Sequence, residues 1–264
     1  MPNLSRVLLA TERVDLEPLA QSFLTRQFPD VEIRTLSLQD FLDSLELDRE
    51  PDMLRVLVIQ CGEDGQIDPG SSLARSILNS FVPVLVLRSH QIEHVAIESI
   101  QRVVVPLDGS TYAAQALPLA SRIARDLNVP VRFLMVIDPS RVIPPAYAYD
   151  PDAWGLIEEL RQTSHWALTQ AEISLRQDGV EVGSDLLYGP INASLSANIG
   201  PHDLVVMTTH GTARQREGVT LRTLISVPQP MIVMRAMQQE PIVVDGYEAC
   251  SWVEPLHRPG VHTA

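Results

Sequence analysis

The sequence contains no lysine, so all 20 of its basic residues are arginine. This absence excludes a Walker A phosphate-binding loop and catalysis through a lysine Schiff base, because both need that side chain. Cysteine is almost as scarce, since only Cys61 and Cys250 occur and neither lies in a CxxC pattern. We therefore expect two reduced thiols and neither a disulfide nor a metal site.

The chain also lacks long apolar runs and any excess of basic residues. No run approaches the roughly 18 residues that span a bilayer, and no secretion signal opens the sequence. We therefore expect a cytoplasmic protein that does not bind a membrane. The net charge is -13, with the acidic excess mainly in residues 1–98. A surface without a basic face also predicts no nucleic-acid partner.

What the sequence does contain is an internal repeat. Residues 55–88 and 203–235 share the same order of a buried strand, a loop with glycine, a helix ending near proline, and a branched apolar strand closed by arginine. Residues 5–12 resemble residues 101–108 in the same way. Two repeats in one order are typical of two related units within one chain.

The repeats predict a domain organisation and a contact between its parts. We expect one domain at residues 1–98, a second at residues 99–236 and a partly ordered tail at residues 237–264. The closing strands near residues 84–88 and 231–235 are expected to pair, either within the chain as a pseudo-dimer or between chains as a homodimer.

Strands alternate with helices throughout both domains, which predicts an α/β fold of three layers with parallel sheets, similar to a Rossmann fold. Right-handed crossovers in the second domain give the strand order 3-2-1-4-5. The first domain is a reduced copy, because one strand and one helix are missing between Leu36 and Leu54. The segment 138–152, with four prolines, is expected to hold no regular element and to act as a flap or an interaction surface.

Two strand ends of the second domain are expected to flank a crevice, because ligands bind such sheets where the strand order reverses. These ends lie at residues 106–110 and 208–211. Asp108 either accepts hydrogen bonds from a sugar hydroxyl or base amine, or caps the following helix. His210 either orients a ligand or bonds a neighbouring carbonyl.

The start of the last helix is a second candidate feature of this crevice. Gly218 and Thr220 open that helix, whose free N–H groups can receive a phosphate without any lysine. The alternative is an ordinary solvated loop, which the charged residues Arg214, Arg216 and Glu217 also fit.

Four segments together resemble the signature segments of the universal stress protein family. They are VVVPLDGS at 103–110, YGP at 188–190, DLVVMTTHG at 203–211 and PQPMIVMR at 228–235. The resemblance implies the five-stranded sheet described above, binding of ATP or AMP in the crevice, and dimers through the last strand. The candidate binding residues are Pro106, Leu107, Asp108, Val136, Thr208, His210, Gly211, Gly218, Val219 and Thr220.

The sequence departs from the family at the loop that would hold phosphates. Members that bind ATP resemble one another in the pattern G-x2-G-x9-G-[S/T]. Here Thr208 replaces the first glycine, only six residues separate Gly211 from Gly218, and Val219 follows. The first domain has Gly62, Gly65, Gly70 and Ser71, with only four residues between the second and third glycines. A short loop offers fewer N–H groups to a triphosphate.

We therefore expect a non-catalytic regulatory protein of the universal stress type that binds an adenine nucleotide weakly in its second domain and acts on a protein partner. One alternative is a slow ATP hydrolase with Asp108 or His210 as base, although no metal cluster or GxSxG elbow supports it. Another is a scaffold that binds its partner through residues 138–152.

Overall fold

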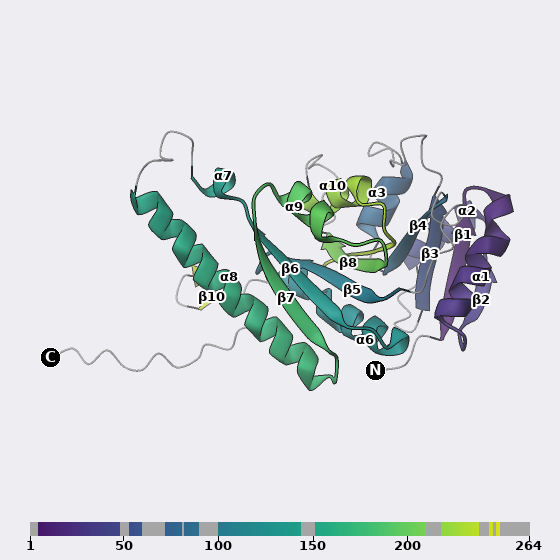
Figure 1. Ribbon diagram of the computed structural model, residues 1–264. Coiled ribbons are helices and arrows are strands. Elements are labelled where there is room, and N and C mark those ends of the chain that lie inside the picture. The colour runs from purple at the N-terminus through teal and green to yellow at the C-terminus, as the bar shows by residue number, and fades with distance from the viewer. Residues whose placement is uncertain are drawn as a thin grey trace.

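The computed structural model contains one large sheet with helices on both faces (Figure 1). The residues that it describes are 5–47, 53–59, 72–80, 82–89, 100–143, 151–209, 218–237, 243–244 and 247–248. Nine strands form the sheet in the order β2-β1-β3-β4-β9-β8-β5-β6-β7. No helix in these ranges is both long enough and apolar enough to cross a membrane.

The first half of the sheet has four parallel strands in the order β2-β1-β3-β4. They are β1 (Arg6–Thr11), β2 (Glu32–Thr35), β3 (Met53–Ile59) and β4 (Val84–Arg88). Every residue of β3 and β4 is buried, as expected for central strands covered on both faces. A single helix, α2 (Leu38–Leu47), follows β2 where a complete copy would have a further strand and helix.

The second half of the sheet has five parallel strands in the order β9-β8-β5-β6-β7. They are β5 (Arg102–Leu107), β6 (Val131–Ile137), β7 (Val182–Tyr188), β8 (Asp203–Thr209) and β9 (Met231–Arg235). In order of sequence within this half, the arrangement is 3-2-1-4-5, which confirms the predicted topology.

The two halves meet where β4 pairs antiparallel with β9. Leu85 lies opposite Ile232, and Val84 lies opposite Val233. The six residues paired at the joint, Val84 to Val86 and Met231 to Val233, are at most 2% exposed. The intramolecular pairing predicted for the closing strands is therefore present, and it joins the two parallel sheets into one mixed sheet. Since β4 also pairs with β3, and β9 with β8, both strands have neighbours on their two edges.

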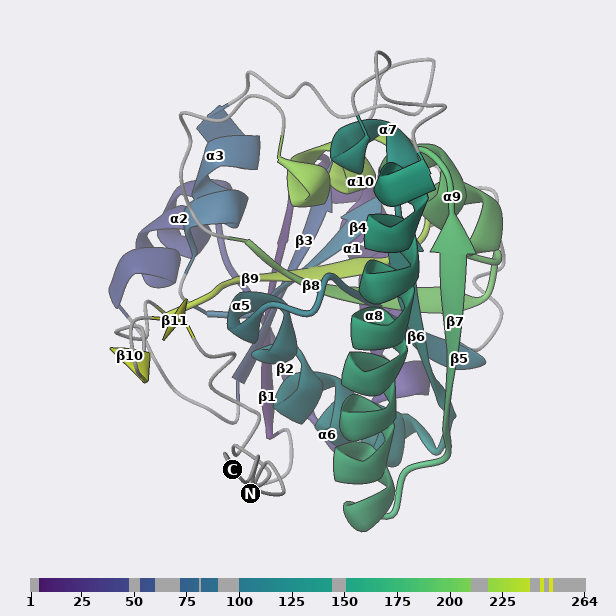
Figure 2. The same ribbon diagram turned by 90° about the vertical axis from the view of Figure 1, so that its left-hand side faces the viewer.

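Amphipathic helices cover the sheet on both faces (Figures 1 and 2). One face carries α1 (Glu17–Gln27), α6 (Leu117–Leu127) and α8 (Pro151–Gln177). The other face carries α2, α3 (Ser72–Asn79), α9 (Ile191–Asn198) and α10 (Val219–Ser226). Each helix turns its apolar stripe toward the strands, so one apolar core lies on each side of the sheet.

Proline corrects the predicted elements at two places. The segment 138–152 does hold regular structure, because Pro139 begins the short helix α7 (Pro139–Val142) and Pro151 begins α8. Proline is favoured at the first turn of a helix, where its missing N–H has no partner to lose. Two helices follow β5, namely α5 (Thr111–Ala114) and α6. Pro118 lies in the first turn of α6 and cannot continue a helix that began earlier.

Beyond β9, β10 (Val243–Val244) pairs antiparallel with β11 (Tyr247–Glu248) in a separate sheet of two strands. Several predictions fall outside the described residues: the state of the two cysteines, and the glycine loop of the first half.

Candidate functional site

The two strand ends predicted to flank a crevice are the carboxyl ends of β5 and β8. These strands pair over three residues each: residues 102–104 of β5 lie opposite residues 203–205 of β8. Beyond that point β5 continues beside β6, and β8 continues beside β9 to the end of each strand. The two central strands therefore separate toward their carboxyl ends, which is the position where open α/β sheets bind ligands.

Asp108 stands at the first side of the crevice and is exposed. Its Oδ1 accepts a hydrogen bond from the Ser110 N–H at 2.9 Å, across Gly109 with φ of 81°. The N-cap of α5 is Ser110, whose Oγ accepts from the Ala113 N–H at 3.1 Å. Asp108 thus shapes the turn and does not cap the helix itself, which leaves its second oxygen available on the exposed side.

Thr208 spans the crevice from its second side. Its hydroxyl donates to the Tyr112 carbonyl in α5 at 2.9 Å. The Thr208 carbonyl in turn accepts a hydrogen bond from the Thr220 hydroxyl at 2.7 Å. A chain of two hydrogen bonds therefore ties α10 to β8 and β8 to α5. Glycine, the residue that the family resemblance leads one to expect at position 208, has no side chain to form this link.

The start of α10 lies on the same side of the crevice. Gly218 is the N-cap of α10 and has no side chain to cap the helix. Val219 and Thr220 begin the first turn of α10. The first N–H groups of an α-helix have no partner within the helix and carry a partial positive charge. The half-buried position of these three residues keeps that turn near the surface.

Three other predicted residues lie at strand ends but on different faces of the sheet. Pro106 is buried and pairs with Leu134 of β6, and Val136 packs against the core under α9 and α10. Leu107 belongs to the core on the opposite face, under α6. The structure therefore groups Pro106 with Val136 on one face and separates Leu107 from them. His210 and Gly211 lie outside the described residues.

Sequence reasoning missed one side chain at the crevice, Gln115. Its amide accepts from the Met237 N–H at 2.8 Å and donates to the Met237 carbonyl at 2.9 Å. The preceding residue, Ala236, extends the strand by donating to the Thr209 carbonyl at 2.8 Å. Gln115 thus fixes the chain after β9 beside α5. No sequence pattern signals this contact, because a polar residue at a helix end has many alternative partners.

Within the described ranges, no three histidine, cysteine, aspartate or glutamate side chains come together as metal ligands would. The groups that the crevice offers are therefore a carboxylate, two threonine hydroxyls already hydrogen-bonded to carbonyls, and the N–H groups of a helix start. Such a set can bind hydroxyl or amine donors at one side and an anion at the other.

Comparison with known proteins identifies relatives of both the sequence and the fold. A sequence model described as "Universal stress protein family" matches residues 99–235. Universal stress protein MJ0531 of Methanocaldococcus jannaschii is 28% identical over 148 residues, which cover 53% of this chain and 85% of that protein.

Two solved structures are also similar. A universal stress protein from Archaeoglobus fulgidus DSM 4304 aligns over 88% of both chains, with a TM-score of 0.53 and 13% identity. A universal stress protein in complex with cAMP aligns over 53% of this chain and all of its own, with a TM-score of 0.39 and 18% identity. Since the family match spans more than half of the sequence, this chain belongs to the universal stress protein family.

Proposed function

We propose that this chain is a non-catalytic regulatory protein of the universal stress type that binds an adenine nucleotide weakly in the crevice between β5 and β8. The observation that carries the proposal is the separation of these strands beyond Val104 and Val205, with the exposed Asp108 at the opening. A carboxylate at such a strand end is suited to accept hydrogen bonds from a ribose hydroxyl or from the adenine amine.

In this proposal the other candidate residues divide by the part of the nucleotide that they contact. Pro106 and Val136, which share one face of the sheet, supply apolar surface for the base. The first N–H groups of α10, at Val219 and Thr220, receive a phosphate. His210, Gly211 and Gly218 belong to the loop that encloses it. Leu107 drops out of this set because its side chain packs in the opposite core.

The weakness of binding follows from the contacts that already occupy the crevice. The link from Thr220 through Thr208 to the Tyr112 carbonyl joins the elements that a ligand would have to enter between. Breaking one such hydrogen bond without replacement costs about 1 kcal/mol, or roughly a fivefold loss of affinity. The shortened loop from Gly211 to Gly218 adds to this cost, because it offers fewer N–H groups to the phosphates.

The non-catalytic part of the proposal rests on the threonines. Thr208 and Thr220 both donate their hydroxyl hydrogens to backbone carbonyls. A nucleophile or an activated water requires a general base at hydrogen-bonding distance, and neither hydroxyl is directed at one. Regulation then operates through a protein partner, for which we propose the surface around residues 138–152 of the second domain.

We further propose that the two halves of the sheet are two domains, residues 1–98 and 99–236, and that only the second retains the nucleotide site. The complete set of five strands, with a crevice at the reversal of their order, occurs in the second half. In the described residues of the first half there are four strands and no equivalent of β7.

Isothermal titration calorimetry with ATP, AMP and cyclic AMP tests the proposal. We expect saturable binding of at least one nucleotide, and binding about tenfold weaker in Asp108→Ala, because a hydrogen bond to a charged group is worth about 1.5 kcal/mol. Asp126→Ala, which removes the same charge from α6 on the opposite face, is the matched control and should bind as the unmodified chain does.

Two results would overturn the proposal. Absence of heat with all three nucleotides would remove nucleotide binding. Phosphate release from ATP that rises in proportion to protein and disappears in Asp108→Ala would show an enzyme, with Asp108 in a catalytic role.

A further inference from the structure

The short helix α10 begins beside the candidate site. The Thr220 hydroxyl in its first turn donates to the Thr208 carbonyl of β8 at 2.7 Å. The Arg222 N–H donates to the carbonyl of the N-cap residue Gly218 at 3.1 Å and closes the same turn. The whole helix has eight residues, which is about two turns. The turn at the site is therefore directly followed by the last turn of the helix.

A buried arginine from the first half of the sheet holds the other end of α10. Arg88, the last residue of β4, is 2% exposed and donates to the carbonyls of Leu224 and Val227. It also contacts the Ile225 carbonyl at 3.4 Å. These carbonyls lie in the last turn and at the C-cap, where a helix has no N–H groups of its own to bond them. The negative end of the helix dipole also attracts the cation.

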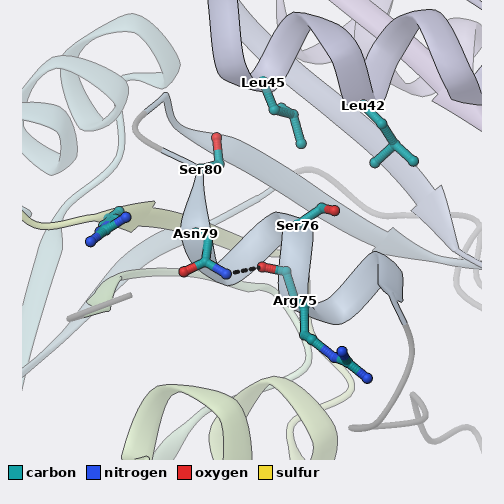
Figure 3. A pocket seen from close by; sticks show the side chains of 7 residues that line it. Leu42, Leu45, Arg75, Ser76, Asn79 and Ser80 are labelled. Atoms are coloured by element: carbon teal, nitrogen blue, oxygen red, sulfur yellow. Dashed lines mark hydrogen bonds between the residues drawn. The ribbon is translucent and has the colours of Figure 1, made fainter. Parts of the chain in front are cut away.

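The corresponding arginine of the second half has different surroundings. Arg235 closes β9 as Arg88 closes β4, but it is half-buried and lines a cavity of about 360 Å³. Residues of α2 and α3 line the same cavity, and Leu42 and Leu45 project into it from α2 (Figure 3). These two helices form no part of the candidate site. Of the two related arginines, Arg88 is the one that contacts a helix of the site.

The contact with Arg88 matters for the first turn of α10 because the helix is short. Without the guanidinium, the carbonyls of the last turn lose their donors at a buried position, which favours unwinding of that turn toward water. One remaining turn is not stable, since a helix needs several consecutive turns to offset the cost of its first hydrogen bond. Loss of order at the end therefore spreads to the N–H groups at Val219 and Thr220.

We propose that Arg88 is a positioning residue for the nucleotide site, because it holds the end of α10 and thereby orders the first turn, where the phosphate binds. This inference rests on the proposed nucleotide binding. Arg88 and the phosphate stabilise one helix from opposite ends, since its dipole favours a cation at the end and an anion at the start. The two contacts share the entropic cost of ordering α10, which makes them cooperative. A bound nucleotide therefore also strengthens the contact between the halves.

Calorimetric titration of Arg88→Met with AMP and with adenosine tests the inference. We expect the AMP affinity to fall about fivefold, as for a charge at a helix end. The adenosine affinity should stay the same, because adenosine has no phosphate for α10 to bind.

The matched control is Arg55→Met. Arg55 lies in β3, is fully buried, and donates to the Ser44 carbonyl in the last turn of α2 at 3.3 Å. It holds a helix end as Arg88 does, but α2 forms no part of the site. Arg55→Met should therefore lose stability, as Arg88→Met does, and still bind AMP as the unmodified chain does. Equal AMP affinities in the two variants, or an equal loss for AMP and adenosine in Arg88→Met, would overturn the inference.

Hydrogen exchange without nucleotide separates this inference from the proposed function. The Arg222 amide, which closes the first turn of α10, should exchange about tenfold faster in Arg88→Met than in Arg55→Met. Equal exchange rates in the two variants would show that Arg88 does not order the first turn, whatever the nucleotide affinity. If the unmodified chain binds no AMP, the proposed function fails, and faster exchange at Arg222 would still support control of α10 by the first half.

Discussion

Arg88 and Arg235 occupy the same place in a repeated pattern, yet they have opposite environments. Arg88 is buried and holds the end of a helix from the other half of the sheet, whereas Arg235 lines a cavity. In a symmetric dimer of identical chains, such a pair would have to remain the same. Because both copies lie in one chain, each contact across the joint is encoded twice, and one of the two is free to change.

The crevice shows the same kind of divergence at larger scale. The second half keeps five strands and a reversal of strand order, and the first half keeps four strands. The halves nevertheless share the joint, where Leu85 and Ile232 are almost completely buried. The joint is therefore retained in both copies, while the number of strands beside it differs between the halves.

The largest effect is expected from a charge placed in the joint. Leu85→Asp puts a carboxylate without a cationic partner at a position that is 1% exposed, and we expect a loss of more than about 4 kcal/mol, enough to unfold the chain. Urea unfolding followed by circular dichroism measures it. Leu19→Asp, at a position of α1 that is 46% exposed, should change the stability little. A folded Leu85→Asp variant would contradict the buried joint.

The next largest loss of stability is expected from replacing Arg88, and a smaller loss from replacing Arg235. Arg88→Met removes the donors that satisfy the last carbonyls of α10, and we expect a loss of about 3 kcal/mol in the free energy of unfolding. Arg235→Met, at a half-buried position, should cost less than Arg88→Met. The same unfolding measurement on both variants decides the matter. Equal losses of unfolding free energy in the two variants would contradict a difference between the environments of Arg88 and Arg235.

A smaller difference is expected between two buried leucines on corresponding helices. Leu195 of α9 lies in the closed core, and Leu45 of α2 already borders the cavity. We expect Leu195→Ala to cost about 3 kcal/mol and Leu45→Ala about 2 kcal/mol, because a side chain beside empty space loses fewer contacts. Thermal unfolding of the two variants gives the comparison, and a larger cost at Leu45 would go against it.

The topology was predictable because it depends on strong local patterns. Apolar strands, regular alternation with helices and the repeat predicted the strand order and the pairing of the two closing strands, whereas the register at Leu85 and Ile232 comes from the structure. The effect of proline on the helices was not predicted correctly. Pro118 separates α6 from α5, whereas Pro139 and Pro151 begin helices. Which of these occurs depends on the position of proline within the helix and not on its presence.

The reversal of strand order between β5 and β8 was predictable, but the contacts at these strand ends were not. The sequence left Asp108 between two roles, and the structure gives the cap to Ser110. The hydrogen bond from Thr208 to Tyr112 joins residues 96 positions apart. The hydrogen bond between Gln115 and Met237 joins residues 122 positions apart. Such pairs depend on the distance between elements after packing, which no periodicity in the sequence reports.

We propose that the strand ends of β5 and β8 bind an adenine nucleotide and that Thr208 hinders its entry. Calorimetric titration of Thr208→Ala with AMP, beside the unmodified chain, tests this proposal most directly. Removing the hydroxyl breaks the link between Thr208 and the Tyr112 carbonyl, and we predict AMP binding roughly fivefold tighter, the equivalent of about 1 kcal/mol. Unchanged or weaker binding in Thr208→Ala, or no binding by either protein, would contradict the account.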